Sequence, residues 1–356
     1  MAKERAINDE DRDCSAVQGG IGMAEMVVRG NRTAEVVDFR KRIPAHVREI
    51  IEAHLAIESE DALSAGELGF MARALVLATM PYRDPKADVF VRVNGDFRLR
   101  IVAGYEGGVP FGIYPRLLLS WVTTEAVAKQ SPVVELGSSL AHFLRDVMDL
   151  RSKSGGPRGS ATRVAEQMKR TFGALITAQY GGSMQHRPFI LRNVLIADEF
   201  QLDNRDEKAL DNLAPDALWE PQAPTEAGNW RSKVRLTDRF FEECVSNPVP
   251  IDLRAYKALR DNPTAMDLYT WLTYRMSYVQ RRTRTIPWAL LQLQFGSTYT
   301  LDPQGTRNFK SRFLNALKLV QVVYPEAKVA VDATGLVLVP SPPHITKLSN
   351  RQLPLL

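Results

Sequence analysis

The sequence predicts an α+β fold in which helices alternate with short strand pairs, as two similar units in tandem behind a flexible N-terminal arm. Several segments carry apolar residues at three-and-four spacing, which is the pattern of amphipathic helices. Short alternating runs separated by turn residues indicate hairpins. The second half repeats this order of elements without repeating the sequence. The 356 residues are 45% hydrophobic, which is enough for globular cores, and the length suggests two or three domains.

The first 60 residues are predicted to be a flexible arm outside the folded core, because they mix charge with a Gly-Gly pair and few aromatic residues. A helix is possible from Pro44 to Glu58. An apolar helix pattern then covers residues 66–79. It ends before Met80-Pro81, because proline disfavours helical backbone at the residue that precedes it.

A β-hairpin follows the proline. The runs VFVRV and FRLRIVAG flank Asn94-Gly95-Asp96, and Asn-Gly between two alternating runs is a strong hairpin signal. We expect the side formed by Val89, Val91 and Val93 to pack on the flanking helices.

The rest of the first unit has the order helix, turn, helix, strand pair. A helix beginning near Pro115 is followed by a short strand at 133–136, a helix to about residue 148, and a Gly- and Ser-rich basic loop. The next helix is predicted from Ser160 to Tyr180, and AQY and FILRNVLIA around Gly181-Gly182 supply the strands. This order is typical of a winged helix-turn-helix, which we place at residues 61–197.

An acidic stretch separates the two units. Residues 198–228 contain nine acidic and two basic side chains, so the stretch carries about −7 and the remainder of the +5 chain about +12. We interpret it as a linker or surface insertion.

The second unit, residues 229–346, repeats the order of the first. Helices are predicted at 264–280 and 286–295, the second ending at Gly296. A turn, a long helix at 307–323 and the strand pair KVAVDA and GLVLVP follow. We predict a second winged helix, and we assign residues 347–356 to a C-terminal tail.

Two helices carry a polar stripe opposite an apolar face. Both stripes offer side chains that contact phosphates and base edges in DNA. An ordinary surface helix also has a polar face, but two such helices in matching contexts favour DNA reading. The stripes consist of Arg163, Gln167 and Arg170 in the first unit, and of Arg307, Ser311, Asn315 and Lys318 in the second.

Clusters of basic residues accompany these helices. Arg281, Arg282 and Arg284 lie between two predicted helices, where they can clamp phosphates or form a solvated connector. Arg158 and Lys310 complete the predicted DNA-contacting set. Between Arg275 and Lys318 the only acidic residue is Asp302, which favours a polyanionic partner.

The sequence shows no catalytic, metal or cofactor site. The five histidines are scattered without HxH or HExxH spacing, and the glycine pairs lack a phosphate-binding lysine pattern. The two cysteines have neither zinc nor disulfide spacing. We therefore expect no enzyme activity and no cofactor. The charged N-terminus is no signal peptide and no apolar run reaches membrane length, so we expect a cytoplasmic protein.

Several segments resemble the RepA-type replication initiators of broad-host-range plasmids. The resemblance covers about residues 65–345. It rests on GVPFGIYPRLLLSWVTTEA, LGSSLAHFL, GGPRGSATRVAEQMKR, DLYTWLTYR, IPWALLQLQFG, FKSRFL and GLVLVPSPP, in that order.

The resemblance implies binding to repeated double-stranded sites in a plasmid origin through two winged helices. It also implies recruitment of the host initiator and replicative helicase, opening of the origin, and possible homodimers. The alternative is a winged-helix transcriptional repressor that does not open DNA. A third reading, a nuclease or primase, would need convergent carboxylates that the sequence does not show.

Overall fold

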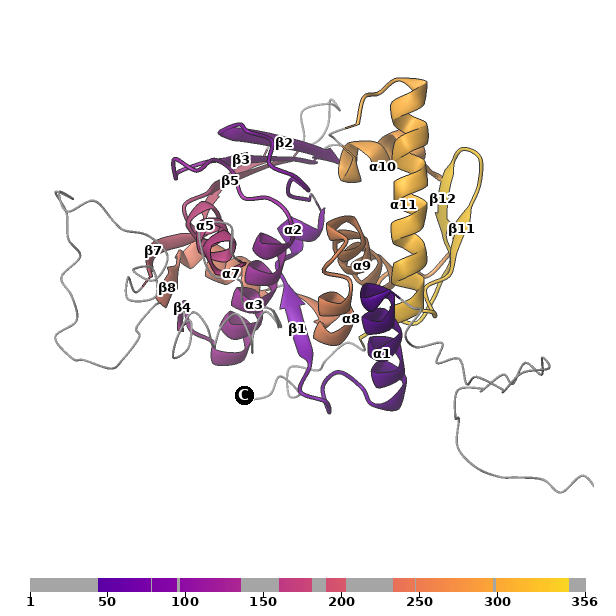
Figure 1. Cartoon of the computed structure of the whole chain (residues 1–356), viewed down its shortest axis with the longest axis horizontal. Helices are drawn as coiled ribbons and strands as arrows, with labels where there is room; N and C mark the ends of the chain where they lie inside the picture. The colour runs from indigo at the N-terminus through magenta and orange to yellow at the C-terminus, as the bar shows by residue number, and fades with distance from the viewer. Residues whose placement is uncertain are drawn as a thin grey trace, which may run out of the picture. The chain divides into compact units, whose positions relative to one another are not determined.

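A computed structural model describes residues 44–77, 79–94, 97–135, 160–180, 190–202, 233–246, 248–296 and 299–345. The chain divides into Met1–Pro44 and a compact unit from Ala45 to Leu356. Figure 1 shows the helices and strands of this unit. Residues 1–43 of the predicted arm, most of the acidic stretch, the predicted helix to residue 148 and the C-terminal tail lie outside the described residues.

Helices and strands are interspersed along the described chain, as the α+β prediction requires. The helices are α1 (Ala45–Ser59), α2 (Arg73–Leu77), α3 (Ile113–Lys129), α5 (Ser160–Phe172), α7 (Asp238–Ser246), α8 (Leu253–Ala258), α9 (Pro263–Met276), α10 (Trp288–Phe295) and α11 (Pro303–Val323). The strands are β1 (Leu68–Met71), β2 (Val89–Asn94), β3 (Phe97–Val102), β4 (Val133–Glu135), β5 (Leu175–Tyr180), β6 (Ile190–Leu195), β7 (Ala197–Gln201), β8 (Lys233–Leu236), β9 (Val249–Asp252), β10 (Ile286–Pro287), β11 (Val329–Val331) and β12 (Gly335–Leu338).

The described strands form four small antiparallel sheets. Their orders are β1-β9, β2-β3-β5-β6, β4-β8-β7 and β10-β12-β11. Strand β7 contains residues 198–201, so these residues belong to a sheet and not to the predicted linker. The two ranges predicted as winged helices, 61–197 and 229–346, lie in the same compact unit.

Helix α1 belongs to the folded unit, which corrects the prediction that the first 60 residues lie outside the core. Ile50 and Ala53 are buried in the main core, and α1 packs against α8 and α11. Its C-terminal end is also fixed by Arg254 of α8, which donates to the carbonyl oxygens of Ala56 at 2.9 Å and Glu60 at 2.8 Å. The helix expected at 44–58 is confirmed as α1, but the predicted arm is too long because this helix packs into the core.

Residues 66–79 are a strand and a short helix, not the single helix predicted. Strand β1 pairs with β9, with Leu68 opposite Asp252 and Met71 opposite Val249. A Cβ at Gly69 would lie 2.4 Å from a Leu253 side-chain carbon, so a larger residue here would require the Leu253 side chain to move. The partner strand lies far away in the sequence, and this tertiary pairing overrides the local helix pattern.

The β2–β3 hairpin is confirmed, but its buried side is the opposite of the predicted one. Phe90 pairs with Ile101 and is buried, whereas Val89 and Val91 are 39% and 42% exposed. The alternation of apolar and polar residues in β2 predicts the wrong buried side, because the polar residue Arg92 occupies a core position. This guanidinium donates from Nε to the carbonyl of Thr79 at 3.1 Å and from Nη2 to that of Met80 at 3.4 Å.

One continuous hydrophobic core serves both predicted units. It includes Leu99 and Met168 from the first range and Leu268, Trp271 and Phe313 from the second. On α9, Leu268 and Trp271 are buried and Tyr274 is partly buried, whereas Tyr278, beyond the end of this helix, is 49% exposed. In Figure 1, α9 lies between α2 and α11.

A buried ion pair joins the two predicted units. The guanidinium of Arg116 on α3 contacts both carboxylate oxygens of Asp267 on α9, at 2.7 and 2.8 Å. It also donates to the carbonyls of Met80 at 2.8 Å and Pro81 at 3.2 Å. The guanidinium carbon of Arg116 lies 5.0 Å from the centroid of the Tyr82 ring. Burial raises the pKa of the Tyr82 hydroxyl.

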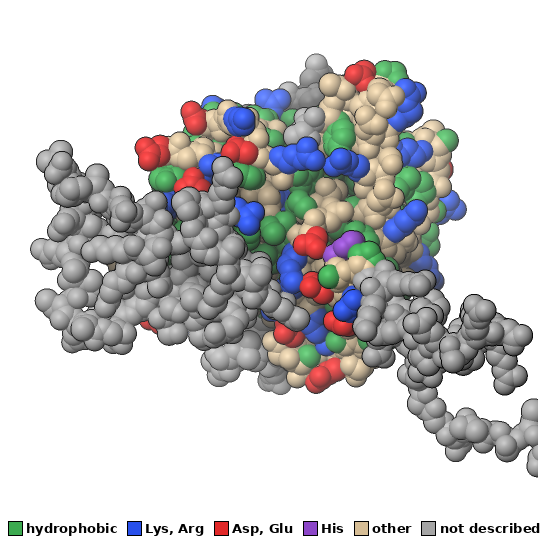
Figure 2. All heavy atoms as spheres, viewed as in Figure 1, with side chains coloured by type: hydrophobic (Ala, Val, Ile, Leu, Met, Phe, Trp, Pro, Cys, Tyr) green, Lys and Arg blue, Asp and Glu red, His purple; other side chains and the backbone are tan. Residues whose placement is uncertain are grey.

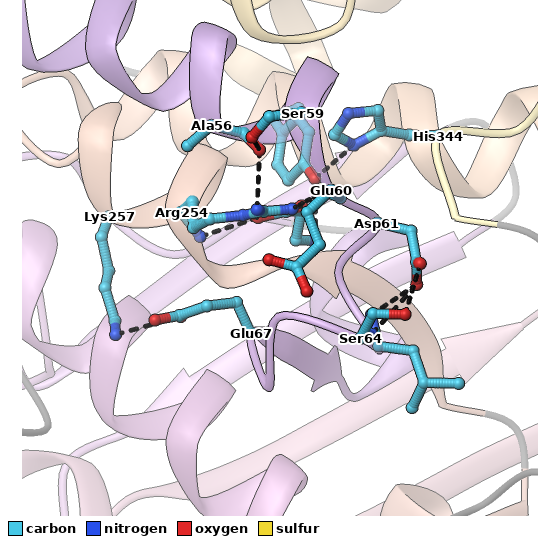
Figure 3. A network of polar contacts seen from close by, with 12 residues as sticks. Ala56, Ser59, Glu60, Asp61, Ser64, Glu67, Arg254, Lys257 and His344 are labelled. Carbon is cyan, nitrogen blue, oxygen red and sulfur yellow. Dashed lines mark hydrogen bonds and ion pairs between the residues drawn. The ribbon is translucent and has the colours of Figure 1, made fainter.

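His344 belongs to a polar network beside α1 and α8, drawn in Figure 3. The backbone N–H of Asp252 donates to the Tyr269 hydroxyl at 2.9 Å, and this hydroxyl lies 2.7 Å from Nδ1 of His344. The hydroxyl proton of Tyr269 is therefore available for a hydrogen bond to Nδ1 of neutral His344. Burial lowers the pKa of His344 below 6.5, although Asp252 and Glu326 act in the opposite direction; Arg254 adds to the lowering.

Acidification should destabilise the fold through His344. The unfolded chain takes up a proton near the ordinary pKa of 6.5, whereas the folded chain resists protonation until a lower pH. Between these pKa values the unfolded state binds more protons, so the free energy of unfolding falls as pH drops below 6.5. Urea unfolding above and below this window should show a larger loss for the wild type than for His344→Gln. Equal losses would contradict the assignment.

Candidate nucleic-acid interface

Helix α11 begins at Pro303, four residues before the predicted start. Oδ1 of Asp302 caps the helix by accepting the N–H of Gly305 at 2.6 Å, and Pro303 takes the first helical position, where it needs no N–H donor. This adds an N-terminal turn in which Pro303 and Gln304 are exposed and Gly305 is buried. The predicted helix at 307–323 is confirmed for the rest of its length.

The polar stripe of α11 faces solvent as predicted. Arg307, Ser311, Asn315 and Lys318 are all exposed, opposite the buried residues Phe309, Phe313, Leu317 and Val320. Three further exposed polar residues of this helix, Gln304, Asn308 and Arg312, lie outside the predicted stripe. In Figure 2, Lys and Arg side chains recur along the side of the molecule where Figure 1 places α11 and the hairpin β11–β12.

The buried side chain of Gln292 fixes the angle between α10 and α11. Its Nε2 donates to the Thr300 carbonyl in the connecting turn at 2.8 Å, and its Oε1 accepts the hydroxyl of Thr306 at 3.0 Å. One amide therefore holds both the turn and the first part of α11. The N-terminal turn of α11 is thus held in place before any partner binds.

The close packing at Gly305 makes a sharp stability test. A Cβ at this position would lie 2.0 Å from the Thr300 carbonyl oxygen, and backbone atoms cannot rotate away as a flexible side chain can. Gly305→Ala should lower the free energy of unfolding by about 1–3 kcal/mol through overpacking, measured by urea denaturation. Ser311→Ala, at an exposed position of the same helix, should change it by less than about 0.5 kcal/mol. Two equally stable variants would contradict this packing.

The basic connector between α9 and β10 is attached to the sheet. The backbone N–H of Thr283 donates to the Leu338 carbonyl at 2.9 Å, and the N–H of Leu338 donates to the Thr283 hydroxyl at 3.0 Å. Arg281, Arg282 and Arg284 are exposed on either side of this anchor. Lys310 is partly buried, with Nζ 4.8 Å from the centroid of the Trp288 ring.

Helix α5 is shorter than the predicted helix 160–180. It ends at Phe172, and Leu175–Tyr180 form strand β5. Gly173 follows the helix, and the β-branched pair Ile176-Thr177 favours a strand. Pairing with β3 then places Ile176 opposite Ile101 in the core, so the apolar residues assigned to the end of the helix are core residues of a sheet.

The first polar stripe does not form as predicted. Gln167 is buried, and its Oε1 accepts the backbone N–H of Phe111 at 3.0 Å, because the segment before α3 covers that side of α5. Arg170 keeps 12% of its side chain exposed. It pairs with Glu166 at 2.9 Å and with Asp84 at 3.5 Å. Arg163 is exposed as expected, and Arg158 lies outside the described residues.

Within the described part of the chain, no group of three or more His, Cys, Asp or Glu side chains is placed to hold a metal ion. Cys244 is buried, and burial raises the pKa of its thiol to about 12. Cys14 lies outside the described residues. None of the described helices combines the length and the apolar character needed to cross a bilayer.

Comparison with known proteins gives one family and a small set of solved structures. The model of a family described as "Plasmid encoded RepA protein" matches residues 109–289, about half of the chain. A crystal structure of RctB domains 2 and 3 is 12% identical, covers 74% of this chain and 94% of its own, and has a TM-score of 0.42. A selenomethionine derivative of these domains is 10% identical, with 75% and 98% coverage and the same TM-score. No curated protein sequence matches this chain.

Proposed function

Because this chain belongs to the RepA family of plasmid replication initiators, we propose that it binds repeated double-stranded sites in a plasmid origin through two winged helices. One observation carries the proposal. Helix α11 buries one face in the core and presents an exposed stripe of basic and amide side chains on the other. Such side chains neutralise phosphates and donate to base edges in a major groove.

The order of elements supports the second winged helix. Helix α9 is followed by β10, α10, α11 and the hairpin β11–β12, and the three strands form one sheet in the order β10-β12-β11. In a winged helix, the third helix of this order enters the major groove and the hairpin forms the wing. The first unit has a similar order of elements, α3, β4, α5, β5 and β6, but β4 pairs with β8 in a separate sheet. Its predicted middle helix lies outside the described residues.

We assign different roles to the basic residues. Arg307, Ser311, Asn315 and, in the first unit, Arg163 are our proposed base-edge readers. Lys310, Lys318 and the three connector arginines are proposed phosphate contacts. Gln167 is no longer a candidate because its amide is buried, and Arg170 would have to leave two carboxylates before it could bind DNA.

Origin opening and partner recruitment follow from the family alone. We propose that several protomers on adjacent repeats strain the DNA and help to melt a neighbouring segment, with the host initiator and helicase joining there. We propose that monomers bind the repeats and that homodimers serve autoregulation.

The test uses the full-length protein on a supercoiled plasmid that carries the origin, with and without host initiator and helicase. A single-strand probe should detect opening beside the bound repeats. Binding to the repeats without any opening, even with host factors present, would contradict initiation and favour the repressor function. Strand cleavage or nucleotide incorporation in the presence of magnesium would indicate an enzyme instead.

A further inference from the structure

Three side chains in the N-terminal part of α11 form a hydrogen-bonded chain on the exposed surface. Nη2 of Arg307 donates to Oε1 of Gln304 at 2.8 Å, and Nε2 of Gln304 donates to Oδ1 of Asn308 at 2.9 Å. All three residues are exposed. Their spacing of three and four residues places them side by side on one surface of the helix.

Arg307 determines which group donates and which group accepts in both hydrogen bonds. A guanidinium can only donate, so Gln304 must turn its oxygen to Arg307 and its amino group to Asn308. Asn308 must then accept with its oxygen, which leaves its amino group free to donate outward. The orientation of both amides is therefore fixed by chemistry.

The two hydrogen bonds among these three side chains use one acceptor position on each amide oxygen. The N–H groups that remain, on Arg307, Gln304 and Asn308, outnumber the remaining acceptor positions. Among the described residues, Arg307 forms no ion pair with a carboxylate. Asp302 caps the helix through Gly305, and the charge of Arg307 contributes to the lowered pKa of this carboxyl. This turn therefore presents mainly donors to a partner.

The support beneath this turn is rigid. Asp302 caps its first residues, the Thr300 carbonyl packs against Gly305, and Gln292 holds Thr306 from inside the core. N-terminal residues of a recognition helix are the ones that contact base edges in helix-turn-helix complexes. A rigid array of donors at this position can discriminate between bases.

We propose that Gln304, Arg307 and Asn308 read a guanine in the major groove. Guanine is the base that presents two acceptors there, O6 and N7, and Arg307 would donate to both. Asn308 would donate to an acceptor of the adjacent base, a second guanine or a thymine. Cytosine and adenine offer amino donors, which this array cannot match well. This inference rests on the proposed DNA binding and adds to it the identity of a base.

The experiment begins with a site selected by the full-length protein from random duplexes, and replaces each guanine of that site singly with 7-deazaguanine. This analogue keeps Watson–Crick pairing and removes only the N7 acceptor. We expect the affinity of the wild type to fall about 5- to 150-fold at one guanine. Arg307→Ala should lose affinity for the unmodified site and show no further loss at that guanine.

Two variants of the same helix complete the test. Lys318→Ala, a proposed phosphate contact, should bind more weakly but keep the full sensitivity to 7-deazaguanine. Gln304→Ala should lose part of the preference for guanine over adenine at this position, because Arg307 would no longer be held. If a site is selected and no guanine is sensitive, this inference is wrong while DNA binding stands. If no site is selected, both the proposed sequence-specific DNA binding and this inference fail.

Discussion

Replacing Arg116 with methionine is expected to destabilise the folded chain by about 3–5 kcal/mol, because the change leaves the buried Asp267 carboxylate without its partner. Arg116 and Asp267 are 1% and 8% exposed, so water cannot take the place of the guanidinium. The carbonyls of Met80, Pro81 and Gly112 would also be left without this donor. Urea unfolding followed by circular dichroism measures the change.

The double variant Arg116→Met with Asp267→Leu provides the control. Removing both charges avoids the uncompensated carboxylate, so this variant should be clearly more stable than the single one. A single variant within about 1 kcal/mol of the wild type would contradict the buried pair. Since Arg116 lies on α3 and Asp267 on α9, the same measurement tests how strongly the two predicted units depend on each other.

Replacing Arg281, Arg282 and Arg284 together with alanine is expected to weaken binding to all DNA sequences alike. Removing one phosphate-binding arginine should reduce the slope of log affinity against log salt by about 0.9, so removing three should reduce it by about 2.7. The preference for a selected site over scrambled DNA should stay unchanged, because phosphate contacts carry no direct sequence information. Titrations of both duplexes at several salt concentrations measure the two quantities.

A charge-matched control uses arginines elsewhere on the surface. Arg98 and Arg100 on β3 and Arg235 on β8 are exposed and outside the predicted DNA-contacting set. Their triple alanine variant changes net charge by the same amount and should leave the salt slope nearly unchanged. Equal slopes for the two triple variants would mean that net charge, and not the connector, attracts DNA.

Two elements could be predicted from the sequence because local signals are sufficient for them. The Asn-Gly turn with its flanking alternation predicts the β2–β3 hairpin, and the three-and-four spacing of Phe309, Phe313, Leu317 and Val320 predicts the orientation of α11. In both cases neighbouring residues alone decide the structure. The exposed stripe of α11 could be predicted for the same reason.

The errors share a cause, which is packing between segments far apart in sequence. Strand β1 is defined by β9, almost 180 residues later. Gln167 is buried because the backbone of Phe111 covers its side of α5. The buried Arg92 reversed the apparent inside of β2. A helix or strand pattern shows a polar face, but it cannot show which polar residue a distant segment will cover.

The array at the beginning of α11 could have been found from the sequence. Asp302 followed by Pro303 is a strong signal for a helix start, and it places Gln304 and Asn308 in the first two turns. Starting the helix at Arg307 hid this signal. The hydrogen-bonded order of the three side chains needs the structure, because it depends on side-chain conformation.

The central claim is that one protomer reads DNA with two helices. The most direct measurement is selection of random duplexes by the purified full-length chain at one fixed physiological salt concentration, followed by sequencing of the bound pool. We expect enrichment of a long asymmetric site that spans about two successive major grooves. Recovery of no enriched sequence, with binding that only falls as salt rises, would contradict it.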